Sequence, residues 1–360
     1  MLVSIIIPTF NCADFLVEAI RSVLAQTYEH YEIIVVDDGS TDHTEASLEQ
    51  FDNRVRYIRQ APGGPSVARN RGILEARGEL IAFLDADDLW RPTKLSRQVE
   101  FLNGHPESIL VYTDFTRGPH PGCNNDSRLK AYKLRDPADP FHALLEENFI
   151  ATPTVVVRRE VLARSGLFDP MLKGSEDFDL WLRLAKTESA RRNGGTGDKD
   201  KNTRGTTHHS LLTTYHFGFI DEILADVRQH ESNTSRSVEF IHHQIRAARI
   251  MLERWGDEPL GSRLLRRRLG LCWWNLAYAE QCRGHYAEAR NAYWSSARFG
   301  FAARSSTMKL FLSWKRREST PSLAAAVARA AVMTLPKNIV RMAMQRKKSE
   351  MNKEVRNTGK

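Results

Sequence analysis

The most constraining feature of this 360-residue sequence is a short apolar run that ends in carboxylates. Residues 80–84 read Leu-Ile-Ala-Phe-Leu, which is typical of a strand buried on both faces, and Asp85, Asp87 and Asp88 follow at once. Because burying an unpaired charge is costly, the three acids must lie just past the C-terminal end of that strand. In open α/β sheets this is the edge where ligands bind.

Three like charges so close together favour a divalent cation among them. Mg²⁺ or Mn²⁺ binds through one or two carboxylates and fills its remaining positions with water and substrate phosphate. The alternative is that an acid here begins a helix before Trp90, and Asp88 suits that position. Three acids exceed what a helix cap needs, so the sequence favours a metal held by Asp85 and Asp87.

The surrounding chain alternates strands and helices, which predicts an α/β fold with a mostly parallel, doubly wound sheet. The expected strands are residues 3–7, 32–36, 55–58 and 80–84, and the expected helices are residues 15–26, 44–51 and 66–76. The second strand ends in Asp37 and Asp38, which therefore share a sheet edge with Asp85 and Asp87. A nucleotide suits this pattern, with Asp38 accepting from a base or ribose and the second cluster holding the diphosphate through the metal.

The segment 60–72 indicates which nucleotide enzymes to exclude. It contains a Pro-Gly-Gly-Pro loop that leads into a basic helix, but neither a phosphate-loop Gly-Lys-Ser/Thr nor a Gly-x-Gly-x-x-Gly fingerprint. An ATPase or an NAD enzyme is therefore disfavoured. Taken alone, Asp37-Asp38-Gly39-Ser40 would be an ordinary turn.

Composition and charge set the wider frame. The chain is 41% hydrophobic and 27% charged, as in soluble globular proteins, with no apolar run of bilayer length and no basic leader. Its four cysteines lie far apart without metal-ligand spacing, so we expect reduced thiols and a cytoplasmic protein.

The charge is distributed unevenly along the chain. Residues 241–360 carry 24 Lys and Arg against 8 Asp and Glu, while the rest carries 28 against 36. The basic segment 336–360 is either an amphipathic helix on an anionic membrane, at the inner face of the cell membrane, or a solvated tail. No nucleic-acid partner is expected.

Several motifs in order resemble the family 2 glycosyltransferases of the GT-A fold over residues 3–236. They are Ser4–Asn11, Val36–Asp42, Gln60–Gly72 with its Ala68-Arg69-Asn70-x-Gly72 core, Asp85–Asp88, Glu176–Arg183 and Arg228-Gln229-His230. Each motif is weak evidence by itself, but the ordered set is strong. Pro62 is a departure, because many relatives have Asn in this loop, and it puts a side-chain contact from that position in doubt.

The resemblance implies roles at matching positions. Asp85 and Asp87 would bind the metal and the donor diphosphate, and His230 would close over the metal or phosphates. Asp177, beside Glu176, would be the catalytic base that deprotonates an acceptor hydroxyl. The implied nucleotide-sugar set is Pro8, Thr9, Asp37, Asp38, Gly64, Arg69, Asp85, Ala86 and Asp87.

Plainer interpretations remain for two of these motifs. Asp177 begins a helix, so one acid among Glu176, Asp177 and Asp179 is expected to cap it while another serves as base. His230 is alternatively a surface histidine. The predicted organisation is a catalytic domain at 1–236 with a polar insertion at 188–214, a helical region at 237–335 and a basic tail at 336–360.

The resulting prediction is a metal-dependent, inverting glycosyltransferase. It would move a sugar from a nucleotide diphosphate, as a UDP-sugar, to a glycan or lipid-linked hydroxyl in cell-surface polysaccharide synthesis. One alternative is a nucleotidyltransferase, which shares a nucleotide fold and an acidic metal site. The other is a non-catalytic scaffold that uses the helical C-terminus.

Overall fold

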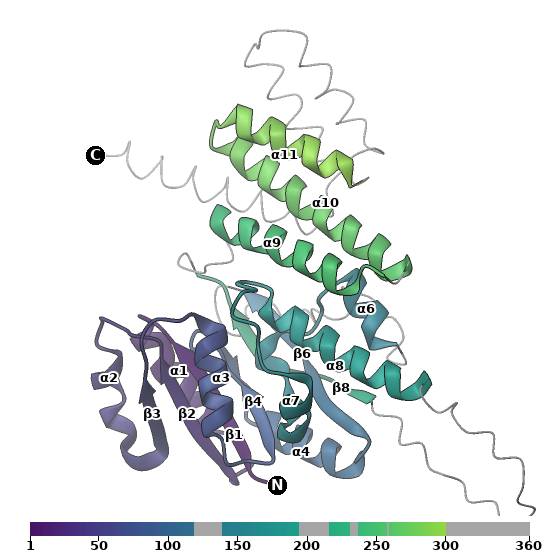
Figure 1. Ribbon diagram of the computed structural model, residues 1–360. Coiled ribbons are helices and arrows are strands. Elements are labelled where there is room, and N and C mark those ends of the chain that lie inside the picture. Colours follow the sequence, from purple (N-terminus) through teal and green to yellow (C-terminus); the bar gives the residue numbers. More distant parts are fainter. Residues whose placement is uncertain (119–138, 194–215, 231–236, 258, 300–360) are drawn as a thin grey trace, which may run out of the picture. The chain divides into compact units, whose positions relative to one another are not determined.

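The computed structural model describes residues 1–118, 139–193, 216–230, 237–257 and 259–299 (Figure 1). The chain divides into a first unit, Met1–Leu265, and a second unit that starts at Arg266. Most of the predicted polar insertion and the whole of the predicted basic tail lie outside the described residues.

The described part of the first unit contains an eight-stranded sheet in the order β3-β2-β1-β4-β7-β6-β8-β5. The strands are β1 (Val3–Thr9), β2 (Tyr31–Asp37), β3 (Val55–Arg59), β4 (Leu80–Phe83), β5 (Leu89–Trp90), β6 (Ser108–Gly118), β7 (Val156–Arg158) and β8 (His216–Arg228). Strands β1 to β4 are parallel to one another, as predicted. Strand β7 runs antiparallel to β4 and β6, β8 is parallel to β6, and β5 is antiparallel to β8. The α/β class is confirmed, and the sheet is mixed in its second half.

The helices of the first unit connect and flank these strands (Figure 1). They are α1 (Ala13–Leu24), α2 (Thr44–Ser47), α3 (Pro65–Glu75), α4 (Lys94–Gly104), α6 (Pro140–Glu146), α7 (Arg159–Ser165), α8 (Glu176–Asn193) and α9 (Val238–Trp255), with 3₁₀ turns η1 (Glu49–Arg54) and η2 (Thr152–Thr154). The prediction of one helix over 44–51 is wrong. Helix α2 ends at Ser47 and the 3₁₀ turn η1 follows from Glu49, with a kink at Asp52, where φ is +48°.

The core lies on both faces of the central strands, which explains their continuous apolar sequences. Ile5 sits between Ile33 of β2 and Ala82 of β4, and all three are buried. Helix α3 approaches β1 closely because Gly72 has no side chain: a Cβ there would lie 2.5 Å from Ile6 Cγ2. This close approach holds the preceding turn of α3, which carries Arg69, against the sheet.

The second unit is helical in its described part, as predicted. It contains the later turns of α10 (Pro259–Cys282) and α11 (Tyr286–Arg298), joined at Gly284 with φ +81°. Ser296 Oγ donates to Gly270 O at 2.8 Å, and the Trp274 and Tyr293 rings meet edge to face at 4.8 Å. Among the helices that the structure describes in either unit, none is both long and apolar enough to cross a bilayer.

Candidate active site

The C-terminal ends of β1, β2 and β4 bring the predicted acidic motifs to one edge of the sheet. Thr9 ends β1 opposite Asp37 of β2, and the Asp38 N–H donates to Thr9 O at 2.9 Å. Leu84 continues from β4 and donates to Ile6 O at 3.1 Å, which places Asp85 next to the same edge. The Thr9 hydroxyl oxygen is buried and has no hydrogen-bond partner among the described residues.

Asp38 organises the loop that precedes α3. Its Oδ1 accepts from Gln60 Nε2 and from the Gly63 N–H, both at 2.8 Å, and its Oδ2 accepts from the Gly64 N–H at 2.7 Å. Gly64 has φ +89°, a backbone conformation that glycine adopts without strain. The structure therefore brings together Asp38 and Gly64, two members of the predicted nucleotide set that lie 26 residues apart.

Asp37 is buried, and both of its carboxylate oxygens accept hydrogen bonds from the protein. Its Oδ1 accepts from the Ser40 N–H at 2.8 Å, and its Oδ2 accepts from the Tyr57 hydroxyl at 2.6 Å. Burial and this bond to Asp37 raise the pKa of Tyr57, so the phenol stays a donor. Asp37 thus fixes the turn that presents Asp38.

The second acidic cluster contains side chains of two kinds. Asp85 and Asp87 keep 29% and 25% of their side chains exposed, whereas Asp88 is buried. Asp87 Oδ2 lies 2.9 Å from His230 Nε2, and the His230 ring stacks on Phe15 at 4.6 Å. The structure therefore brings Asp87 and His230, 143 residues apart, into contact.

Arg228 supports the contact between Asp87 and His230. Its guanidinium donates to the Asp87 carbonyl, pairs with Glu18 of α1, and lies 4.8 Å from the centre of the Phe15 ring. The Arg228 N–H donates to Asp88 Oδ1 at 2.9 Å. The prediction that Asp88 begins a helix is wrong: strand β5 follows it, and its carboxylate instead binds the end of β8.

Arg69 connects the acidic cluster to the first turn of α8. Its Nη2 donates to Asp85 Oδ1 at 2.6 Å and its Nη1 donates to Glu176 Oε1 at 2.9 Å. The guanidinium is 7% exposed and lies 5.4 Å from the Phe168 ring centre. Although burial by itself lowers the pKa of Arg69, the two carboxylates raise it above its ordinary value. The cation is therefore permanent, and it bridges residues 85 and 176.

Asp177 has the properties of a proton acceptor. Its Oδ1 accepts from the Phe178 N–H at 2.6 Å, while Asn148 Nδ2 and Thr152 Oγ1 each lie 3.4 Å from its Oδ2. Burial, and then the neighbouring Glu176 charge, raise its pKa to about 6. A carboxylate with a raised pKa that is ionised at neutral pH is well suited to general-base catalysis.

Asp179 differs from its neighbours because it is fully buried and doubly paired. Arg183 Nε donates to its Oδ2 at 2.8 Å, and Arg254 of α9 pairs with its Oδ1. Arg183 also donates to the carbonyl oxygens of residues 165–167. Asp179 therefore holds α8 in place through two arginines, and it does not cap the helix.

The donor set at the acidic cluster fits a divalent metal. No group of three or more His, Cys, Asp or Glu within the described ranges is gathered tightly enough to hold a metal alone. Mg²⁺ and Mn²⁺ do not need such a cage, because one or two carboxylates suffice when substrate phosphates supply the other oxygens. Burial, and then the Asp87 and Asp85 charges, raise the pKa of Asp88 well above its ordinary value, which shows how closely these carboxylates approach one another. Asp85, Asp87 and His230 are the residues that would hold the ion.

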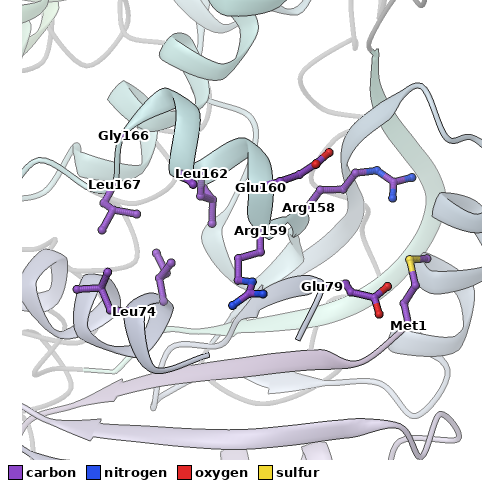
Figure 2. Close-up of a pocket in the computed structure, with 11 residues that line it drawn as sticks. Met1, Leu74, Glu79, Arg158, Arg159, Glu160, Leu162, Gly166 and Leu167 are labelled. Carbon is purple, nitrogen blue, oxygen red and sulfur yellow. The ribbon is translucent and has the colours of Figure 1, made fainter. Parts of the chain in front are cut away.

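A different hollow of about 800 Å³ lies away from these residues (Figure 2). It includes Met1 before β1, Glu79 before β4 and Arg158 at the end of antiparallel β7, so it is at the opposite edge of the sheet. Arg159, one of its lining residues, donates to Ala76 O at 2.8 Å. None of the predicted site residues lines this hollow.

The sheet topology, with acids gathered at the carboxyl edge of its parallel strands, is that of a nucleotide-binding α/β fold. A family model described as "Glycosyl transferase family 2" matches residues 4–166. The glucosyltransferase WfaP of Escherichia coli, "UDP-Glc:alpha-D-GlcNAc-diphosphoundecaprenol beta-1,3-glucosyltransferase", is 30% identical over 68% of this chain and 90% of its own. The chain belongs to the family 2 glycosyltransferases.

One further relative and two solved structures are also similar to this chain. An uncharacterised glycosyltransferase of Rickettsia typhi is 35% identical over 52% of this chain, and the match spans 60% of that relative's length. In fold, the chain resembles residues 1–349 of Staphylococcus aureus TarS, with a TM-score of 0.55 and 17% identity over 91% of this chain and 89% of that fragment. It also resembles the mannosyltransferase PcManGT of Pyrobaculum calidifontis, with a TM-score of 0.50 and 18% identity over 95% of this chain and 83% of that protein.

Sequence reasoning assigned no role to four residues that complete the site. Arg228 belongs to a recognised motif, and its position two residues before His230 was a usable signal. Phe15, Asn148 and Thr152 carry no such signal, because an aromatic on an amphipathic helix and polar residues in a loop are common. Only the folded arrangement shows that they touch His230 and Asp177.

Proposed function

We propose that this protein is a metal-dependent, inverting glycosyltransferase. It transfers a sugar from a UDP-sugar to a hydroxyl of a glycan or lipid-linked acceptor during cell-surface polysaccharide synthesis. The observation that carries the proposal is the Arg69 bridge, which joins Asp85 at the diphosphate end to Glu176 beside the base. Structures with a similar fold support the ligands: one TarS structure is in complex with UDP-GlcNAc, and PcManGT is in complex with GDP-Man and Mn²⁺.

The residues of this chain act in a single displacement. Asp177 Oδ2 takes the proton of the acceptor hydroxyl, whose oxygen forms a bond to the anomeric carbon from the face opposite the diphosphate. The bond from that carbon to the diphosphate oxygen breaks, and its electron pair leaves with the nucleoside diphosphate. One displacement inverts the anomeric centre. Asp85, Asp87 and His230 would hold a divalent cation, which would supply charge neutralisation for the departing diphosphate.

The residues proposed to bind the nucleotide-sugar donor are held by contacts within the protein. The loop that Asp38 holds through the Gly63 and Gly64 amides would form the nucleotide end, and Thr9 would provide a buried hydroxyl beside it. Arg69 keeps Asp85 and Glu176 at fixed positions without itself changing protonation state. In this proposal the donor-binding residues and the base belong to rigid strand and helix ends, which favours correct orientation.

The test is a panel of UDP- and GDP-sugars with and without Mn²⁺, read by thermal shift and by product release. We expect one donor to raise the melting temperature only with the metal, since a ligand of the native state stabilises it. We expect release of the nucleoside diphosphate and transfer of the sugar. Release of pyrophosphate would indicate a nucleotidyltransferase, and the absence of any turnover would indicate a non-catalytic scaffold.

A matched pair of variants sharpens this test. Asp177→Asn removes the proposed base, while Asp14→Asn changes a 94%-exposed aspartate on α1 that pairs only with His43 among the described residues. Asp177→Asn should abolish transfer and keep the donor-induced thermal shift, and Asp14→Asn should change neither. Loss of donor affinity with transfer retained in Asp177→Asn would move the base to another acid.

A further inference from the structure

The side of Asp177 that faces away from its own helix is lined by two polar side chains, from Asn148 and Thr152. Asn148 Nδ2 and Thr152 Oγ1 each lie 3.4 Å from Asp177 Oδ2, longer than the usual ~2.7–3.0 Å for such bonds. The short bond of this carboxylate is on its other oxygen, from the Phe178 N–H at 2.6 Å. Asp177 is therefore anchored through Oδ1, and Oδ2 keeps the capacity to accept a stronger hydrogen bond.

The orientation of the Asn148 amide follows from chemistry. An ionised carboxylate only accepts hydrogen bonds, so the NH₂ group of Asn148 must face Asp177 and its carbonyl oxygen must face elsewhere. That Oδ1 is buried and has no hydrogen-bond partner among the described residues. A buried acceptor without a donor is costly, which indicates that a hydroxyl from outside the protein completes it.

The turn that carries Thr152 is held by hydrogen bonds to neighbouring elements. Pro153 O accepts from Trp90 Nε1 at 2.8 Å, and Thr154 O accepts from Gln98 Nε2 at 2.9 Å. The buried Lys94 Nζ lies 2.7 Å from Gln98 Oε1 and 3.9 Å from the centre of the Trp90 ring. Three buried side chains from β5 and α4 thus fix η2, and a binding group on such a support is placed accurately.

We propose that Asn148 and Thr152 form the acceptor subsite, and that Asn148 Oδ1 accepts a hydrogen bond from a hydroxyl adjacent to the one that attacks. The chain would then select saccharide acceptors with two neighbouring hydroxyls. The attacking hydroxyl gives its proton to Asp177 Oδ2 and its oxygen bonds to the anomeric carbon as the diphosphate leaves. The neighbouring hydroxyl keeps its proton and donates it to Asn148. This inference rests on the proposed function and specifies its acceptor.

The experiment uses the full chain with the donor that supports turnover. Acceptors are a panel of methyl glycopyranosides, with 1-propanol at equal concentration as an alcohol that has no second hydroxyl. We expect transfer to at least one glycoside and much less to 1-propanol. For the best glycoside, removal of the hydroxyl next to the attacked one should lower kcat/KM by roughly tenfold or more, because the amide oxygen is then left unpaired.

The decisive comparison is a double-mutant cycle in which one change is Asn148→Ala and the other is removal of the neighbouring hydroxyl from the acceptor. Asn148→Ala should lower kcat/KM for the complete glycoside by a similar factor, leave the KM for the donor unchanged, and cause no further loss with the deoxy acceptor. Thr152→Val should also weaken use of the acceptor. Thr154→Val is the matched control, because its hydroxyl donates to Ala151 O at 2.7 Å on the same turn and does not face Asp177.

Several results would overturn the inference. If the factors by which Asn148→Ala and the deoxy acceptor lower kcat/KM multiply when combined, the amide and that hydroxyl do not interact. An equal loss in donor hydrolysis by water would show that Asn148 only supports the base. Equal transfer to 1-propanol, or hydrolysis of the donor without transfer to any glycoside, would remove the subsite while leaving the donor chemistry of the proposed function intact. Absence of donor turnover altogether would instead refute the proposed function.

Discussion

Replacing Arg69 tests whether the bridge between the two halves of the site is as strong as its geometry implies. In Arg69→Met the Glu176 carboxylate, whose side chain is 9% exposed, loses its cation and stays buried. Removing one partner of a buried ion pair costs about 3–5 kcal/mol. Asp85 is 29% exposed, so water compensates for much of its loss, and it adds about 1 kcal/mol or less. We expect Arg69→Met to be destabilised by about 3–5 kcal/mol.

The assay is urea unfolding of four proteins: the wild type, Arg69→Met, Glu176→Gln and the double variant. If the penalty comes from an unpaired carboxylate, Glu176→Gln in the Arg69→Met background should recover most of the stability. Arg69→Lys should recover only part, because an ammonium cannot bridge two carboxylates as a planar guanidinium does. Additive effects of the two substitutions, or a loss of less than about 1 kcal/mol in Arg69→Met, would refute the reasoning.

Three further expectations concern the base, the metal and the tail. The pKa of Asp177 in the folded chain is about 6 against an ordinary 3.8, so transfer should fall as pH drops below about 6. Because the folded chain binds this proton more tightly, its stability should decrease as pH rises from about 4 to 6, and Asp177→Asn should unfold at higher urea than the wild type at pH 7; a lower midpoint would contradict this. Asp87→Asn should lose Mn²⁺-dependent donor binding with an unchanged far-ultraviolet circular dichroism spectrum, and full activity of the wild type in chelator would remove the metal. Truncation before Pro336 should weaken co-sedimentation with anionic vesicles in a salt-sensitive way, since each basic residue near such a surface contributes about 1 kcal/mol; equal sedimentation with neutral vesicles would contradict it.

The first half of the sheet was predictable because strands buried on both faces need apolar residues at every position. Strands β1, β2 and β4 are covered on both faces, so they appear as unbroken apolar runs such as Leu80–Phe83. The antiparallel strands gave no comparable signal. Strand β7 has three residues and β5 has two, and runs that short are not distinguishable from loops by periodicity.

The acids of the site were predictable as a group, but their division of labour was not. Glu176, Asp177 and Asp179 lie within four positions, and each could cap a helix or act as base. The spacing of Asp179 and Arg183 at i, i+4 was an available sign of a structural pair. The second partner of Asp179, Arg254, lies 75 residues away, and no local pattern indicates it.

The contacts that sequence could not supply are the ones that join separate parts of the site. Arg69 spans 107 residues to reach Glu176, Arg228 lies 141 residues from the Asp87 carbonyl it binds, and Trp90 lies 63 residues from Pro153. Each is a buried donor on one element bound to an acceptor on another. Together they tie the metal-binding acids to the end of β8, to the first turn of α8 and to the turn that faces Asp177. Under the proposed mechanism, these contacts would couple the diphosphate end to the proposed base and acceptor wall, which would keep leaving group, nucleophile and base in one geometry through the displacement.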